Sequence, residues 1–258
     1  MRTLLCLLLL LIASSPVNAE EMREFQTQVT GRIEVGADGV VSGHALDERL
    51  DPAVRNAVDR NIRGWRFEPV VVDGRPVIAT TTLRLQLTAV PVEGDYALKV
   101  DKVWFGEPQR AHALPSPAYP PDAQRQGIQG RVMLVIRLDA SGSVAEVHAE
   151  QTSLSVSTRG KRGQHWRRMF EDNSIEVAKS WKFNVTEIVN GNPVGGSIRV
   201  PVDYAFKGDS WMQYLPGPVV PAPWVEAGAL ADAGQTPDQA QPLDSRFKLR
   251  TQIVGTTL

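Results

Sequence analysis

The sequence predicts an α+β protein with two small domains, each an antiparallel three-stranded sheet packed by one helix, followed by an irregular Pro-rich C-terminal tail. Three observations predict this class. The same order of apolar positions and turns occurs twice along the 258 residues. In each copy, alternating apolar runs flank a Gly-containing turn, which is typical of a β-hairpin. A stretch with helical spacing of apolar residues then separates each hairpin from a closing strand.

Composition and charge exclude several classes of protein. Lys and Arg number 28 and Asp and Glu number 29, so the formal net charge is -1, which argues against a protein that coats polyanions through bulk charge. Hydrophobic residues make up 42% and charged residues 22%, as in a globular chain. The one cysteine, Cys6, lies in a segment that we expect to be removed. The mature chain would then have no disulfide, zinc–thiolate site or Cys nucleophile.

Residues 1–19 have the three-part pattern of a secretory signal peptide. Arg2 supplies the positive start, residues 4–13 form an unbroken apolar run, and residues 17–19 offer a small-x-small cleavage site. The apolar run is too short to span a membrane as a helix, which needs roughly 20 residues. We expect cleavage after Ala19 and export to the periplasm, with a retained shallow anchor as the alternative.

Residues 20–90 contain the first copy. Its helix is predicted from Leu50, Val54, Val58 and Ile62, which recur every four residues as one stripe. Asp51-Pro52 suits the first turn of that helix, where a missing N–H is harmless. The other features, in order, are the hairpin turn Asp38-Gly39, the pair Trp65 and Phe67, the turn Asp73–Val77 and the strand Thr82–Leu87.

Residues 117–207 contain the second copy. A helical stripe is predicted from Phe170, Val177, Ala178 and Trp181, with Asp172 or Asn173 as the N-cap. The other features, in order, are the hairpin turn Ser141-Gly142, the pair Trp181 and Phe183, the turn Asn190–Val194 and the strand Ser197–Phe206. In both copies we assign the Trp and the Phe to the core that joins helix and sheet, in preference to ligand stacking, because their burial contributes roughly 1.5–3 kcal/mol each.

The second copy is longer between its turn glycine and its Trp, by 13 positions. The surplus falls on Thr158–Arg168, which we predict to be an inserted surface loop. Its basic residues are Arg159, Lys161, Arg162, His165, Arg167 and Arg168. Two interpretations stay open: the loop binds an anionic partner, or it is a solvated loop.

The stretch Pro117–Phe206 resembles the TonB C-terminal domain family. The residues that carry the resemblance are Pro117-Ala118-Tyr119-Pro120, Ala123, Gly127, Gly130, Gly142, Trp181, Phe183, Gly191, Pro193 and Val194. Phe25–Val90 resembles a degenerate second copy that keeps Trp65–Pro69 and Gly74–Val77 but lacks the Tyr-Pro opening. Val185, where the family usually has proline, and the basic insert are departures. The membrane anchor and long Pro-rich spacer of a full-length TonB are not apparent.

Residues 91–116 are predicted to be a linker that contributes an extra strand, and residues 208–258 a Pro-rich tail with a possible terminal strand. We expect the apolar residues of the tail to lie against a domain surface, and residues 227–241 to be flexible. Those apolar residues are Trp211, Tyr214, Leu215 and Trp224. Phe247–Ile253 alternates like a short strand that docks on a sheet edge, either in the same chain or on a partner.

No catalytic motif is apparent. His44, His112, His148 and His165 lack metal-ligand spacing, and there is neither a Gly-x-Ser-x-Gly elbow nor a phosphate-binding glycine loop. We therefore predict a protein that is not an enzyme and that uses no cofactor or metal.

The family resemblance implies binding by strand addition at the open edge of the final strand, Ser197–Phe206. Pro201 independently favours an edge position, because proline cannot donate to a ladder. The predicted partner-binding residues are Arg199, Val200, Val202 and Tyr204. The alternative is that the tail strand or a neighbouring copy blocks this edge.

Two functions follow from this sequence. The first is a periplasmic module that binds an extended peptide or envelope protein, such as a TonB-dependent outer-membrane receptor, with no nucleic acid and no stable membrane span. The second is a structural scaffold or homodimer whose sheet edges are occupied. A membrane-anchored energy transducer is a third possibility, if the signal segment is retained.

Overall fold

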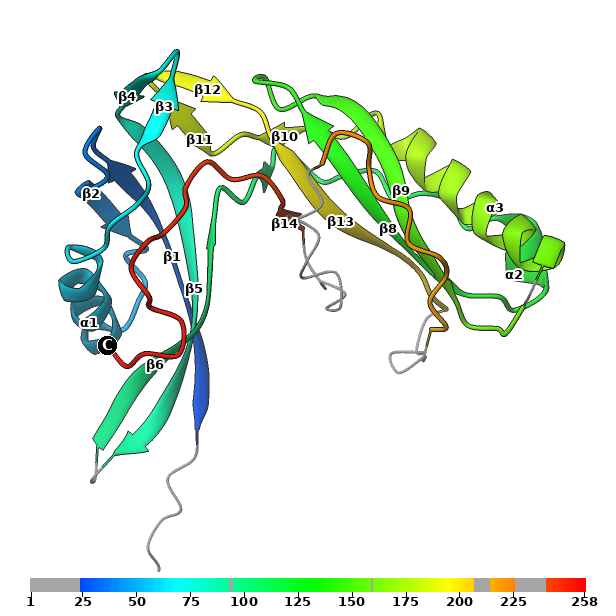
Figure 1. Ribbon diagram of the computed structural model, residues 1–258. Coiled ribbons are helices and arrows are strands. Elements are labelled where there is room, and N and C mark those ends of the chain that lie inside the picture. The colour runs from blue at the N-terminus through cyan, green and yellow to red at the C-terminus, as the bar shows by residue number, and fades with distance from the viewer. Residues whose placement is uncertain (1–23, 93–94, 159, 207–213, 226–239) are drawn as a thin grey trace, which may run out of the picture.

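The computed structural model describes residues 24–92, 95–158, 160–206, 214–225 and 240–258. It confirms the α+β class: two modules, each with a helix packed on an antiparallel sheet, meet at one end and together form an arch (Figure 1). The predicted signal peptide, with Cys6, lies outside the described residues, as does Trp211.

The first module is built around the long strand β5. Its elements are β1 (Phe25–Val35), β2 (Val41–Leu46), α1 (Pro52–Ile62), β3 (Val70–Val72), β4 (Arg75–Val77), β5 (Ala79–Val92) and β6 (Asp95–Phe105). The predicted hairpin and closing strand form β2-β1-β5, and β6 adds to the far side of β5 from Leu83 to Val92. This addition confirms the extra strand predicted in the linker.

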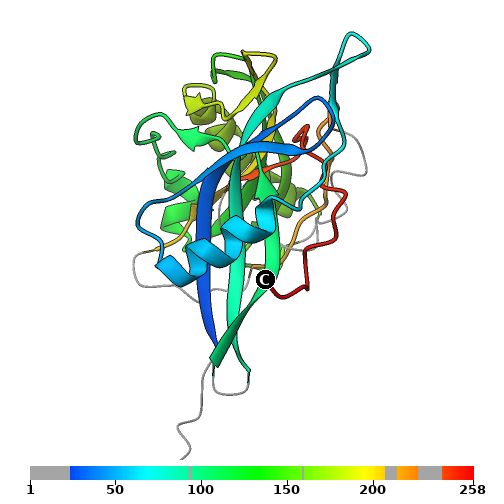
Figure 2. The same ribbon diagram turned by 90° about the vertical axis from the view of Figure 1, so that its left-hand side faces the viewer.

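Helix α1 begins and packs as its sequence predicts. The Asp51 side chain accepts a hydrogen bond from the main-chain N–H of Ala53 at 2.8 Å, and Pro52 occupies the first turn. Val58 and Ile62 are fully buried, and Figure 2 shows α1 lying across the sheet. The core beneath the helix also contains Trp65, Phe67 and Phe105, so the predicted core role of Trp65 and Phe67 is confirmed.

The second module repeats this arrangement with a longer helix. Its elements are β7 (Gln109–Arg110), α2 (Pro121–Arg125), β8 (Gly130–Leu138), β9 (Val144–Leu154), α3 (Gly160–Ala178), β10 (Phe183–Asn184), β11 (Glu187–Val189), β12 (Asn192–Val194) and β13 (Ser197–Tyr204), and β14 (Gln241–Pro242) follows in the tail. The sheet order is β14-β13-β8-β9. Trp181 and Phe183 are buried in its core, as predicted.

The predicted surface loop at Thr158–Arg168 is wrong. Residues from Gly160 onward form the first half of α3, so the predicted caps, Asp172 and Asn173, lie within the helix. The stripe that contacts the sheet extends upstream through Trp166 and Gly163, because both are buried at helical spacing from Phe170. The extra residues therefore lengthen a helix.

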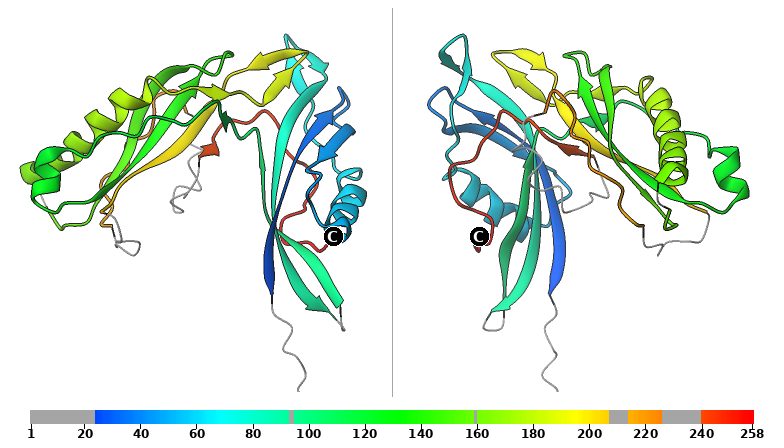
Figure 3. Two further views of the ribbon diagram at one scale, coloured as in Figure 1. Left: turned by 180° about the vertical axis from the view of Figure 1, so that it is seen from behind. Right: turned by 45° about the vertical axis from the view of Figure 1, so that its right-hand side comes forward.

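The hairpin β11–β12 connects the two modules. Strand β11 pairs with the start of β5, Ile188 opposite Thr80 and Val189 opposite Ala79, so it extends the sheet of the first module (Figure 3). The turns of this hairpin and of β3–β4 have positive φ at Asn190 and at Asp73, as tight two-residue turns require.

The C-terminal residues Ser245–Leu258, here called the strap, dock on the first module. Leu249 bridges to Phe67, and Arg250 N donates to Arg66 O at 2.8 Å. Phe247 and Ile253 enter the core of this module. The predicted docking of Phe247–Ile253 thus occurs within the same chain.

In the second module, the linker occupies the position that the strap occupies in the first. Arg110 pairs with Phe183, and Ala111 N donates to Lys182 O at 3.2 Å. In the first module this position is taken by the opposite end of the chain, through the bridge between Phe67 and Leu249.

Replacing Phe247 with alanine should destabilise the first module selectively. The side chain is 4% exposed and its ring lies 6.2 Å from that of Phe67, so we expect a loss of about 3–5 kcal/mol. Hydrogen exchange would measure it, with amides of β1 and β5 losing protection before those of β8. Phe25→Ala, at a side chain that is 57% exposed, is the matched control; an equal loss in both variants would contradict the strap's role.

Candidate functional site: the outer edge of β13

Strand β13 has one fully paired side and one partly open side. It pairs with β8 along its whole length, from Ser197 to Tyr204. On its outer side, β14 pairs only with Ile198 and Arg199. Within the part of the chain that the structure describes, no strand pairs with the outer side from Val200 to Tyr204. This stretch is the candidate site.

The hydrogen-bonding pattern decides which groups the open edge presents. Leu138 N donates to Gly196 O at 2.9 Å, so the alternation of an antiparallel ladder directs Val200 and Val202 toward β8 and turns Pro201 and Asp203 outward. Pro201 has no N–H. The outer edge therefore offers the carbonyls of Pro201 and Asp203 and a single N–H, that of Asp203.

The side chains of the predicted partner-binding residues point away from this edge. Val200, Val202 and Tyr204 belong to the core under α3. Arg199 is 3% exposed and forms an ion pair with Glu150, the Nη2–Oε1 distance being 2.9 Å. A partner at this edge would therefore meet main-chain groups, and whether these four residues contribute to binding stays a prediction.

Tyr204 fixes the end of the strand to the helix. Its hydroxyl lies 2.8 Å from the Ser174 hydroxyl and accepts a hydrogen bond from Asn173 Nδ2 at 3.2 Å. Its ring contacts those of Phe170 and Tyr119. Burial raises the pKa of the Tyr204 phenol, and burial also raises the pKa of Tyr119 to about 12. Both phenols stay neutral near pH 7, which suits their place in an apolar core.

The corresponding edge in the first module is closed. The outer side of β5 pairs with β11 at Ala79 and Thr80 and with β6 from Leu83 onward. Among the residues that the structure describes, β13 is thus the closing strand whose outer side has an unpaired stretch.

The opposite edge of the second module is covered by the tail. Leu154 and Leu215 exchange both main-chain hydrogen bonds, at 3.0 and 2.8 Å. The Trp224 ring lies 5.7 Å from the Arg137 guanidinium, and Tyr214 lies 6.0 Å from that of Arg131. The predicted docking of these tail residues against a domain surface is thereby confirmed for the three that are described.

The basic residues of the first half of α3 form an exposed face. Lys161, Arg162, His165 and Arg168 are exposed, whereas Arg167 is half-buried and its Nε donates to Thr152 O at 3.3 Å. Binding of an anionic partner by this face stays a prediction.

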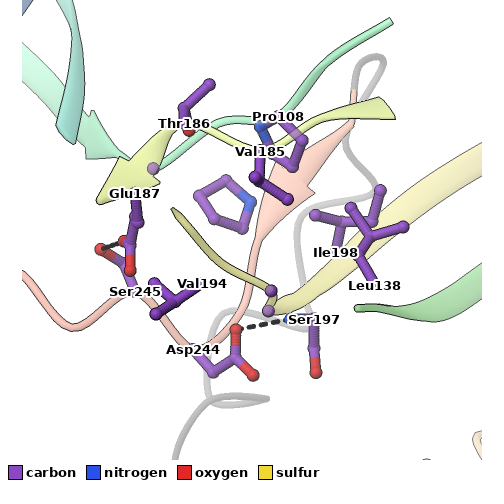
Figure 4. A pocket seen from close by; sticks show the side chains of 14 residues that line it. Pro108, Leu138, Val185, Thr186, Glu187, Val194, Ser197, Ile198, Asp244 and Ser245 are labelled. Carbon is purple, nitrogen blue, oxygen red and sulfur yellow. Dashed lines mark hydrogen bonds between the residues drawn. The ribbon is translucent and has the colours of Figure 1, made fainter. Parts of the chain in front are cut away.

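Two cavities differ in size and character. A cavity of about 20 Å³ lies at the junction of the modules, between the hairpin β11–β12, the start of β13 and the tail (Figure 4). A groove of about 440 Å³ opens on the sheet of the first module. Its carboxylates, Asp47 and Glu107, are each paired with an arginine, Arg49 and Arg84, respectively.

The described residues contain no group of three or more His, Cys, Asp or Glu side chains placed to hold a metal ion. Among the helices that are described, none is both long and apolar enough to cross a membrane.

Sequence reasoning missed Asp203, which carries the one N–H donor of the open edge, and the tail residues that cover the start of β13. The signal for Asp203 was available: Pro201 lies two positions before it, and ladder alternation turns both residues to the same side. Nothing in the sequence of the tail indicates its partner strand.

Removing one partner of the buried Arg199–Glu150 ion pair should destabilise the protein more than replacing both partners with apolar residues. Glu150→Ala leaves the Arg199 guanidinium buried without its counter-ion, so we expect a loss of about 3–5 kcal/mol in the free energy of unfolding. The double variant Glu150→Leu with Arg199→Met should recover most of that loss. Urea unfolding measures both, and a double variant as unstable as Glu150→Ala would refute this reasoning.

Comparison with known proteins shows what part of the second module is similar to. Residues 115–156 match the family described as Gram-negative bacterial TonB protein C-terminal. Protein TonB of Xanthomonas campestris pv. campestris (strain B100) is 37% identical over 89 residues, which are 34% of this chain and 34% of that protein. Protein TonB of Vibrio cholerae serotype O1 is 28% identical over 123 residues, 48% of this chain and 45% of that protein.

The chain thus spans between a third and a half of the length of these curated relatives. No solved structure matches it significantly.

Proposed function

Starting from the TonB C-terminal family as the type of the second module, we propose that this protein binds an extended polypeptide by strand addition to β13. The partner is a segment of an envelope protein, such as a TonB-dependent outer-membrane receptor, and the meeting place is the periplasm. The protein acts by binding and not by catalysis.

One observation carries this proposal: among the residues that the structure describes, none pairs with the outer side of β13 from Val200 to Tyr204, whereas the equivalent part of β5 is closed by β6. An exposed strand edge is a template for another strand, and proteins normally cover or shorten such edges. Here one module covers the edge and the other leaves it open, which favours the open edge as the binding site.

The geometry of the edge defines what a partner strand would contact. Main-chain bonds would form at Pro201 O and at the N–H and O of Asp203, which gives affinity without dependence on sequence. The Asp203 carboxylate is paired with Arg131 at 2.5 Å beside this edge, so this ion pair would contact partner side chains on that face.

The closed edges favour a scaffold as the second candidate function. Both β5 and β9 are covered by segments of the same chain. In that case the paired modules hold other components in place, and the open stretch of β13 has no ligand.

Removing the one outward N–H tests the proposal. Asp203→Pro should weaken binding of an extended peptide from a TonB-dependent receptor by about 2–10-fold, because one main-chain hydrogen bond contributes roughly 0.5–1.5 kcal/mol. Pro201→Ala restores a donor and should strengthen binding by a similar factor. Calorimetry gives the affinity, and NMR shift mapping gives the location.

Asp203→Asn is the matched control, because it keeps the N–H while removing the ion pair with Arg131. Shifts that map away from β13, or equal affinities for Asp203→Pro and Asp203→Asn, would count decisively against strand addition at this edge.

A further inference from the structure

The hairpin β3–β4 carries an unused pairing edge. Val71 is 56% exposed and Val72 is 37% exposed. Because the two-residue turn makes Val72 and Arg75 a hydrogen-bonded pair, the N–H and C=O of Val71 point away from β4. Within the described chain, no segment pairs with this edge.

The other edge of the same hairpin is blocked by proline. Pro76 lies opposite Val71, where its missing N–H faces outward from β4. The hairpin β11–β12 has the same design, with Pro193 opposite Ile188. Each hairpin can therefore extend a sheet on one side only, the side of β3 or of β11.

In the second hairpin this side is in use. Strand β11 pairs with the start of β5, and Asn190 N donates to Ile78 O at 3.0 Å. The docked position is thus defined by three consecutive residues, Ile78, Ala79 and Thr80. Asp73 of the first hairpin is the equivalent of Asn190, since both begin the turn with positive φ.

The same three positions exist in the second module. Val35 and Leu138 are equivalent, because each lies four positions before the turn glycine of its hairpin. Val35 pairs with Ala79, and Leu138 lies opposite Gly196. The residues equivalent to Ile78–Thr80 are therefore Gly195–Ser197.

The tail occupies the main-chain groups of these positions. Leu243 N donates to Ser197 O at 2.8 Å, and Ser197 N donates to Asp244 Oδ1 at 2.6 Å (Figure 4). Arg246 Nη1 donates to Gly195 O at 3.1 Å. Leu243–Arg246, here called the cap, thus satisfies the groups that a docked hairpin would use.

We propose that the hairpin β3–β4 is a docking element for the start of β13 in a second copy of this chain, and that the cap competes with it. The register follows from β11 on β5: Val71 lies opposite Ser197, Val72 lies opposite Gly196, and Asp73 N donates to Gly195 O of the second copy. This contact joins different surfaces of the two copies, so it adds molecules head to tail.

In this proposal the cap prevents a chain that carries both halves of such a contact from extending indefinitely. A heterologous contact that does not close generates filaments, and an exposed apolar strand edge promotes them. With the cap in place the acceptor is closed and the chain is a monomer. Displacement of the cap frees the main-chain groups of Gly195–Ser197 at the start of β13, and the hairpin β3–β4 need not change.

The test removes the cap and then the hairpin edge. In the triple variant Leu243→Pro, Asp244→Ala, Arg246→Ala, sedimentation velocity should show association that rises with concentration, at loadings where the unmodified chain is monomeric. Adding Val71→Pro, which deletes the outward N–H and leaves the β3–β4 ladder intact, should weaken this association at least tenfold. Val71→Thr keeps the N–H and is the matched control, with association retained.

A mixing experiment gives the register and does not depend on the stability of the triple variant. One copy carries Val71→Cys and a differently tagged copy carries Ser197→Cys, both with Cys6→Ser. Oxidation should link the two tags, at least tenfold more when the cap is removed, and Ser143→Cys in place of Ser197→Cys should not link.

A cap-removed chain that stays monomeric would overturn the proposal, as would association that Val71→Pro leaves unchanged or links at Ser143→Cys equal to those at Ser197→Cys. Peptide binding at Asp203 is measured separately, so failure of one proposal leaves the other intact.

Discussion

The outer edge of the closing strand is the constraint on which the rest of this structure depends. Each module ends with a strand whose second side carries unpaired main-chain groups, and such groups must find partners or remain in water. In the first module, β11 and β6 take up this side of β5. In the second, β14 takes up only its beginning. The linker, the hairpin β11–β12 and the tail supply these partners, and this requirement accounts for where they lie.

The two modules solve the same packing problem with segments from different parts of the chain. Strand β10, which carries Phe183, pairs with the linker, and Phe67 forms a bridge with Leu249 of the strap. The start of β5 pairs with a hairpin, and the start of β13 pairs with the tail. The two modules therefore share the same pairing positions, but different segments of the chain occupy them.

The repeated parts of the fold could be predicted from the sequence, because their signals are local. Turn glycines, the stripe through Val58 and Ile62, and the Trp-x-Phe pairs each depend on residues a few positions apart. The helix start at Gly160 was missed because charged residues hide a stripe marked only by Trp166 and Gly163. The partner of the strap could not be predicted, since pairing over more than a hundred residues leaves no periodic signal in either segment.

The same limit applied at the candidate site. In the described residues no strand pairs with Pro201 on the outer side of β13, although β14 pairs with the start of that strand, and alternation of side chains places Val200, Val202 and Tyr204 in the core. Which side of the strand a residue's N–H faces depends on the register with β8, and register is decided by the whole sheet.

The position of the strap also has a consequence for the order in which the molecule is completed during synthesis. The second module draws one flanking strand from residues just before it, and its sheet is complete once β14, Gln241–Pro242, has been made. The first module is translated earlier but lacks the strap until Phe247 and the residues after it are available, and Leu258 N donates to Leu98 O at 2.8 Å. The half of the protein that is made first is therefore the half that matures last, and a nascent chain halted before its final codons would hold one finished module and one open one.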